Sequence, residues 1–240
     1  MQRFADCKFR CGESDSGKPL KVSLNVFAEY MASQEDDSPL YVFDDTFGDE
    51  SRALLDEYTV PPYFTEDLFS YLGDNRPPFR WLLIGPKRSG TSIHQDPLST
   101  SAWNASLSGY KLWAFFPPSL PYPIVKGRGL TLPGEDDEPI FYFRDMLPRI
   151  QRKYGVGPFM AVQRPGDVMF APHHWWHAVL NLSDSIAVTQ NFANSYTFDT
   201  VWRSVKRQRK KLFPEWKAAL EVHRPDLFRR GLALDQFDGE

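Results

Sequence analysis

Short apolar segments separated by turn residues fill the chain between positions 79 and 192, and this pattern limits the possible folds more than any other feature. The segments that we interpret as strands cover 79–84, 110–116, 160–163, 168–171, 177–182 and 185–192, with one more strand leading into His94. No long helical pattern alternates with them, which argues against a parallel α/β sheet. Twenty prolines favour loops and tight turns. The sequence therefore predicts a mainly β fold with flanking helices, a barrel or jelly roll.

Three parts are expected within a chain of 240 residues, which is short enough to form one domain. Residues 1–75 are predicted to be a lead-in of helices and strands that packs on the barrel. Residues 76–195 should form the barrel, with an insertion near 117–160. Residues 196–240 should form a helical extension.

Helical patterns flank the predicted barrel. A helix should begin at Ser23 as its capping residue, because Leu24, Phe27 and Met31 follow at helical spacing. A short strand and two short helices are expected next, at 40–43, 50–58 and 65–72.

The insertion and the tail each predict helices. The insertion starts as an irregular, acidic stretch and is expected to become helical over 143–154. The tail from Asp199 onward predicts two helices divided near Pro214, because a proline ring interrupts a helix interior.

Two histidines and an aspartate in the predicted barrel have the spacing of a metal site. His94 and Asp96 are separated by one residue, and His177 follows far along the chain after two tryptophans. Residues i and i+2 of a strand point to the same face, so His94 and Asp96 can reach one ion together. A histidine from another strand would complete the facial triad that usually holds non-haem Fe(II) in oxygenases. The alternative is that these are core or surface histidines without a ligand.

Other candidate ligands are weaker. His173 and His174 are expected to be exposed or to face a substrate, although a shifted register would present His174 in place of His177. Cys7 and Cys11 could be half of a zinc site, but no second Cys/His pair lies nearby. Two cysteines are too few for a disulfide framework and indicate a reducing compartment. No apolar run is long enough to cross a bilayer, so no membrane partner is expected.

The charges are distributed unevenly. The net charge is −3, but residues 203–211 carry six Lys or Arg residues and no acid, so the rest of the chain carries −9. This net negative charge outside residues 203–211 makes the main part of the protein acidic, and an acidic surface attracts basic partners. The basic run is typical of a nuclear-import signal, of an RNA-binding segment or of a solvated helix face.

Several segments together resemble a known family. Residues 85–113 read GPKRSGTSIHQDPLSTSAWNASLSGYKLW, and DDSPLYVFD, VPPYFTEDLF, PPFRWLLIGP, WWHAVLNL and AVTQNF occur elsewhere in the chain. These sequences resemble the JmjC-domain 2-oxoglutarate oxygenases, most closely the branch of bifunctional arginine demethylases and lysyl hydroxylases. JmjC proteins joined to F-box domains share much of the pattern. The resemblance implies a double-stranded β-helix, a cupin-like jelly roll, that uses Fe(II), 2-oxoglutarate and O2.

The resemblance also implies roles for individual residues. His94, Asp96 and His177 match the metal ligands, and no catalytic residue beyond them is expected. Lys111 matches the cation that binds the far carboxylate of 2-oxoglutarate, the alternative being a strand lysine with its ammonium in solvent. The other matching residues are Thr91, Asn104 and Thr189 for the cosubstrate, and Tyr41, Trp81 and Asn191 on the substrate side or just behind the cosubstrate. For Trp81, simple core packing is the alternative.

The implied function is hydroxylation of lysyl side chains, or demethylation of N-methylarginine, in basic Lys/Arg-rich proteins. Family members of this kind are nuclear chromatin regulators, so a nuclear or partly cytoplasmic location is expected, and the tail helices resemble a dimerisation element. Relatives carry additional sequence before the position of Met1, so the chain is expected to be a shorter relative or a fragment. Two alternatives remain open: a catalytically silent jelly-roll scaffold, and an RNA-binding protein that uses residues 203–211.

Overall fold

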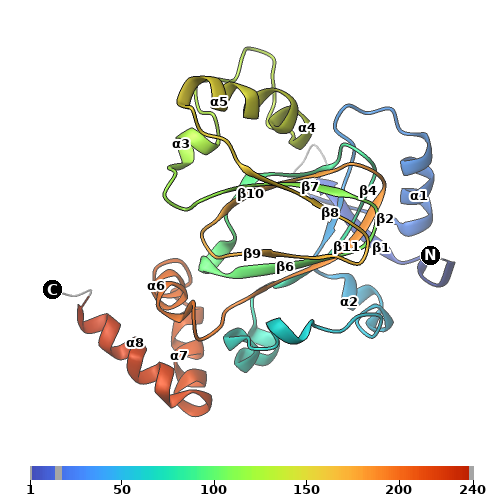
Figure 1. The fold of residues 1–240 in the computed structure, drawn as a ribbon. Helices are drawn as coiled ribbons and strands as arrows, with labels where there is room; N and C mark the ends of the chain where they lie inside the picture. Colours follow the sequence, from blue (N-terminus) through green and yellow to red (C-terminus); the bar gives the residue numbers. More distant parts are fainter. Residues whose placement is uncertain (1, 14–17, 238–240) are drawn as a thin grey trace.

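Two antiparallel sheets face each other in the computed structural model, which describes residues 2–13 and 18–237 (Figure 1). One sheet has the strand order β3 (Val42–Asp44), β4 (Arg80–Gly85), β11 (Ser185–Phe192), β6 (Ser101–Ser108) and β9 (Val168–Ala171). The other has the order β5 (Gly90–His94), β10 (Trp176–Asn181), β7 (Lys111–Phe116) and β8 (Phe159–Gln163). Consecutive strands alternate between the sheets from β4 to β7 and again from β8 to β11, so this is a jelly roll, as predicted.

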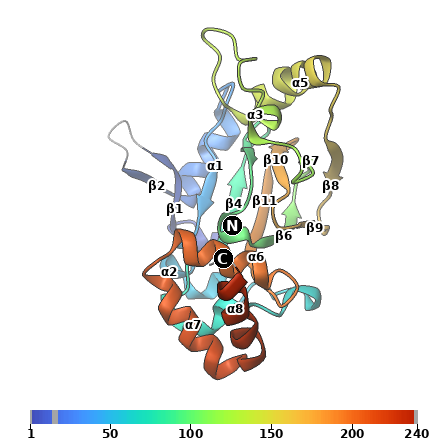
Figure 2. The ribbon, with the colours of Figure 1, turned by 90° about the vertical axis from the view of Figure 1, so that its left-hand side faces the viewer.

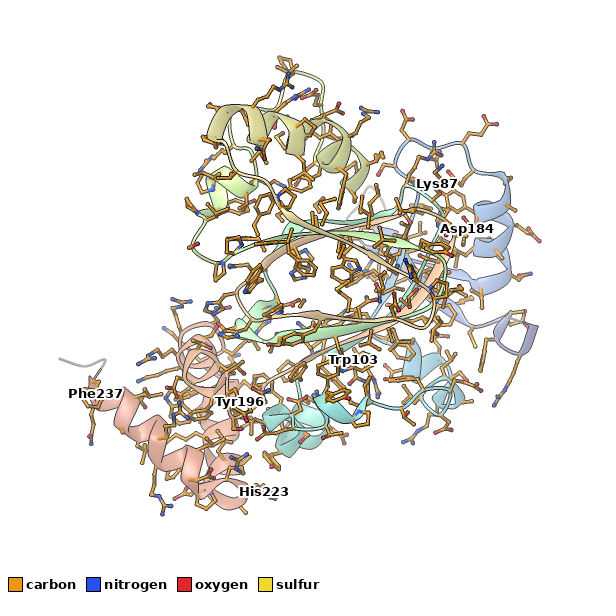
Figure 3. The ribbon with its side chains drawn as sticks, in the orientation of Figure 1. Lys87, Trp103, Asp184, Tyr196, His223 and Phe237 are labelled. Carbon is orange, nitrogen blue, oxygen red and sulfur yellow. The ribbon has the colours of Figure 1, made fainter. Side chains whose placement is uncertain are left out.

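The interior between the sheets follows from the alternation of side chains along each strand. In β6, Ala102 and Asn104 point inward to a cavity, while Trp103 packs on the opposite side against Phe64 at a ring-centroid distance of 6.3 Å. Figure 3 shows Trp103 on the side of the five-stranded sheet that faces the short helices below it. The strand β6 was missed by the sequence analysis.

The insertion covers the outer face of the four-stranded sheet (Figure 1). It comprises α3 (Tyr122–Val125), α4 (Pro139–Phe141), a π-helical turn (Tyr142–Met146) and α5 (Leu147–Tyr154). Ile150 of α5 is fully buried in a cluster with Ala114 and Ala178 of the sheet. The helix predicted over 143–154 is therefore confirmed, and it ends at Gly155, which takes the left-handed conformation that favours glycine.

The N-terminal part extends the five-stranded sheet and packs on its outer face (Figure 2). It contains a 3-10 turn (Gln2–Phe4), the hairpin β1 (Lys8–Glu13) and β2 (Pro19–Ser23), α1 (Leu24–Ser33), α2 (Phe47–Glu50) and 3-10 helices at Arg52–Leu54, Pro62–Phe64 and Leu68–Asn75. The helix expected from Ser23 is present with Ser23 at its N-cap position, although the Ser23 side chain makes no capping hydrogen bond. The β1–β2 hairpin was not predicted from the sequence.

Three helices, not two, follow the barrel: α6 (Phe198–Gln208), α7 (Leu212–His223) and α8 (Pro225–Phe237). The predicted break near Pro214 is wrong, because Pro214 lies in the first turn of α7, where a helix tolerates proline. The breaks fall at 209–211 and at Arg224. Within the described part of the chain, none of the helices has both the length and the apolar character needed to span a membrane.

Candidate metal centre and cosubstrate cavity

The three predicted metal ligands converge at one end of the barrel. His94 is the last residue of β5, and it lies directly opposite His177 of β10 in the strand ladder. Their rings are 4.2 Å apart between centroids. Asp96 lies just beyond β5, but its backbone is still extended, so the alternation of the strand continues through it. One ligand atom from each of the three residues lies within 4.8 Å of the others.

The two imidazoles are oriented by backbone carbonyl groups. Nδ1 of His94 is 2.8 Å from the carbonyl oxygen of Ser92, and Nδ1 of His177 is 3.1 Å from that of Trp175. A carbonyl can only accept, so each Nδ1 carries the proton and each Nε2 keeps a free lone pair. This arrangement is the usual one for histidines that bind a metal through Nε2.

The charges of the triad fit a cation. Oδ2 of Asp96 is buried without a hydrogen-bond partner among the described residues, and it lies 3.9 Å from Nε2 of His177. Burial, and then the proximity of His94, lower the pKa of His177 to about 4, so this ring is neutral at neutral pH. A buried carboxylate beside neutral imidazoles is costly unless a positive charge compensates it. Two nitrogens and one carboxylate oxygen are the donor set expected for Fe(II).

A cavity of about 220 Å³ lies between the sheets and contains the triad. We call it the reaction cavity. It brings together six further residues that the sequence analysis selected, namely Tyr41, Trp81, Thr91, Asn104, Thr189 and Asn191. Apolar side chains such as Trp113, Met169 and Val179 form much of the remaining wall. An apolar wall with a few convergent polar groups is typical of a small-molecule site.

Lys111 is fully buried, so the alternative of an ammonium in solvent is wrong. Its Nζ donates to Oδ1 of Asn181 at 2.7 Å, to Oγ of Ser185 at 3.0 Å and to the hydroxyl of Tyr41 at 3.4 Å. All three acceptors are neutral, and burial lowers the pKa of Lys111 to about 7. Lys111 does not itself line the reaction cavity; Tyr41 does, and its hydroxyl connects the two.

Hydrogen bonds fix the polar groups of the cavity wall. Nε2 of Gln163 donates to Oδ1 of Asn104 at 3.2 Å, and Nε1 of Trp113 donates to Oε1 of Gln163 at 2.8 Å. The hydroxyl of Thr189 donates to a backbone carbonyl of β6 at 2.8 Å. Nδ2 of Asn191 donates to a threonine hydroxyl at 2.9 Å. A preorganised wall of this kind spares a ligand the cost of ordering the side chains.

His173 and His174 do not belong to the triad. They are half-buried in the turn that precedes β10, and their rings are 5.1 Å apart. The side-chain amide of Gln95 donates to the carbonyl of His174, whose φ is 63°. His177, not His174, is therefore the residue that the register presents to the metal site. Burial lowers the pKa of both His173 and His174.

Sequence reasoning missed three buried polar residues that hold the site together. Asn181 and Ser185 contact the Lys111 ammonium, and Gln163 contacts Asn104. The only signal available was their position at the ends of predicted strands. Within residues 2–13 and 18–237 the triad is the only group of three or more possible ligands, so Cys7 and Cys11 have no partners for a zinc site there.

Comparisons with known proteins agree with the geometry. Residues 81–192 match the family described as JmjC domain, hydroxylase. The chain is 38% identical over 234 residues to the bifunctional arginine demethylase and lysyl-hydroxylase psr-1 of Caenorhabditis elegans, covering 94% of this chain and 58% of the relative. It is 37% identical over 222 residues to the arginine-specific demethylase JMJ22 of Arabidopsis thaliana, with 86% and 43% covered. It is 27% identical over 172 residues to the 2-oxoglutarate and iron-dependent oxygenase JMJD4 of Mus musculus, with 70% and 40% covered. The chain thus spans less than two thirds of the length of these relatives.

Proposed function

We propose that this chain, which belongs to the JmjC family through its domain at residues 81–192, is an Fe(II)- and 2-oxoglutarate-dependent oxygenase acting on protein side chains. The observation that carries the proposal is the triad, in which Oδ2 of Asp96 is buried without a hydrogen-bond partner among the described residues and both imidazoles offer Nε2. When bound there, iron would supply the activation of O2 that hydroxylates a C–H bond while 2-oxoglutarate loses CO2. The chain itself would bind, orient and shield the reactants.

Lys111 is proposed to bind the far carboxylate of 2-oxoglutarate. Its ammonium is buried among neutral acceptors, so an incoming carboxylate would supply the missing counter-charge. Tyr41 connects Lys111 to the reaction cavity, and Thr91, Asn104 and Thr189 line that cavity. We assign these five residues to the cosubstrate, and Trp81 and Asn191 to the substrate side or to support of the cosubstrate.

The proposed substrate is a lysyl or N-methylarginyl side chain of a basic protein. The names of the nematode and plant relatives describe lysyl hydroxylation and arginine demethylation. The acidic body of this chain favours a basic partner. Hydroxylation of a side-chain carbon leaves an alcohol, whereas hydroxylation of an N-methyl carbon leads to loss of formaldehyde.

The activity can be tested with Lys- and methylarginine-containing peptides, Fe(II), 2-oxoglutarate and O2. We expect succinate release and a peptide product that either gains one oxygen atom or loses one CH2 group by intact-mass analysis. Asp96→Asn and Lys111→Met should abolish both signals, whereas Lys87→Met, which changes an exposed lysine, should not. Succinate release that is the same in the Asp96→Asn and Lys111→Met variants as in the wild type would refute the proposal.

The basic segment 203–211 supports RNA binding as a second candidate function. Lys206 pairs with Asp235 at 2.8 Å, but Arg207, Arg209 and Lys210 are exposed. Binding of a single-stranded RNA should weaken steeply with salt and should survive His94→Ala, because phosphate contacts do not need the triad. The same segment leads us to propose a nuclear location, which a fluorescent fusion with Arg209 and Lys210 neutralised would test.

A homodimer through the C-terminal helices is also proposed. Val222 of α7 and Phe237 of α8 are each 76% exposed, although both side chains are apolar. Packing of two copies through these helices would remove both side chains from water. Sedimentation should give a dimer for the wild type and a monomer for Val222→Asp; equal masses for the two would refute this interface.

A further inference from the structure

A second hollow of about 440 Å³ adjoins the reaction cavity. Tyr41, Phe43 and Trp81 line both spaces, so these rings form a common wall. The rest of the hollow is lined by Arg10, Gly12, Glu13 and Asp45. We call this space the outer hollow. A side chain seated in it would lie across the aromatic wall from the triad.

The common wall presents aromatic rings to the outer hollow. The rings of Tyr41 and Phe43 are 6.4 Å apart, and those of Phe43 and Trp81 are 5.8 Å apart, in tilted arrangements. Phe43 is 39% exposed although its strand neighbours Val42 and Asp44 are buried. A large apolar ring facing an open space beside an acidic group is the combination that attracts an organic cation through its π face.

The charged groups of the outer hollow leave one carboxylate uncompensated. Arg10 forms an ion pair with Glu13, so these two charges cancel. Asp45 has no hydrogen bond or ion pair with any other residue that the structure describes. The hollow therefore combines one free negative charge with aromatic faces.

The wall of the outer hollow is held in place by Asp44. This fully buried residue accepts hydrogen bonds from the backbone N–H of Arg10 at 2.6 Å and from the backbone N–H of Thr46 at 2.6 Å. The first bond ties β1 to β3, and the second fixes the backbone that follows β3. The space is thus bounded by backbone that is fixed in the folded protein, and not by one mobile side chain.

We propose that the outer hollow binds a second cationic side chain, a lysine or arginine, that flanks the oxidised residue in the protein substrate. This inference rests on the proposed function and specifies it, because it makes a neighbouring positive charge part of substrate selection. The target side chain reaches the triad inside the reaction cavity. The flanking cation contacts Asp45 and the face of Phe43 on the other side of the wall.

The test uses two peptides that differ at one position beside a central lysine, with arginine in one and its neutral isostere citrulline in the other. Binding of each is measured by calorimetry on the iron- and 2-oxoglutarate-loaded protein without O2, so no turnover is needed. The wild type should prefer the arginine peptide. Asp45→Asn should reduce the preference about two- to fivefold, and Phe43→Leu should reduce it by a similar factor.

Arg10→Gln should change the preference for the arginine peptide in the opposite direction to Asp45→Asn. Without Arg10, Glu13 loses its partner and becomes a second free carboxylate in the outer hollow, so the preference for the arginine peptide should increase. A merely structural effect of substitutions in this region would not change sign. Asp49→Asn, which removes an exposed acid outside the hollow, is the matched control and should leave the ratio of the two affinities unchanged.

Failure of this inference can be told from failure of the proposed function. Equal affinities for the two peptides, or the same ratio in Asp45→Asn, Arg10→Gln and the wild type, would overturn the outer hollow as a cation site even if both peptides are oxidised. A preference that follows these variants while O2 yields no succinate would support the cation site and contradict the oxygenase assignment instead.

Discussion

The affinity for 2-oxoglutarate should depend on pH through Lys111. Burial lowers the pKa of this lysine from its ordinary value of 10.5 to about 7, because its partners are neutral. A bound carboxylate favours the ammonium and raises the pKa again. Above pH 7, binding must therefore take up a proton, and the dissociation constant increases by up to tenfold for each pH unit. Between pH 7 and pH 9 this amounts to a weakening of about fiftyfold, or roughly 2.3 kcal/mol.

The assay is an anaerobic titration of the iron-loaded protein with 2-oxoglutarate at several pH values. The wild type should show the weakening and a matching proton uptake. Lys111→Met should bind weakly at every pH with no slope between pH 7 and pH 9, while Lys87→Met should behave as the wild type does. A flat wild-type profile, or an equal slope in Lys111→Met, would refute the role assigned to Lys111.

Three further predictions concern stability and the metal. In the metal-free protein, the unfolding free energy should increase from pH 7 toward pH 9, because the folded state releases the Lys111 proton while unfolded chains keep it. Urea titrations should show this increase in the wild type but not in Lys111→Met. Gly90→Ala would place a Cβ 2.0 Å from the carbonyl oxygen of Val179 and so shift β5 against β10; calorimetry should give a lower Tm and weaker Fe(II) binding. Asp67→Asn would leave the largely buried guanidinium of Arg76 without its ion-pair partner and should cost about 3 kcal/mol in urea denaturation; a loss within experimental error would contradict this.

The His94–Asp96 half of the metal site was predictable because it depends on local geometry. His94 and Asp96 share a face through simple alternation, and that alternation persists although Asp96 lies beyond the end of the strand. Lys111 was found through its resemblance to a family pattern. Its buried partners Asn181 and Ser185 were not, because no local pattern shows which polar residues of distant strands will meet.

The fold was predicted in outline but not in its less apolar parts. The strand β6 has the sequence SAWNASLS, which lacks β-branched residues, so propensity gave no strand signal there. Its interior place in the five-stranded sheet comes from pairing with β11 on one side and β9 on the other. In the tail, α6 ends at Gln208 and is capped by Arg209, with no glycine or proline to mark the end. Pro214 does not break a helix, because it occupies the permissive first turn of α7.

The most direct test of the account is an anaerobic Fe(II) titration followed by calorimetry and metal analysis. The account predicts one iron per chain for the wild type and for Lys87→Met. It predicts loss of specific binding in His94→Ala, Asp96→Asn and His177→Ala, with each variant still folded by circular dichroism. Iron bound equally well by the wild type and by the folded Asp96→Asn variant would contradict the triad as the metal site, and with it the proposed oxygenase.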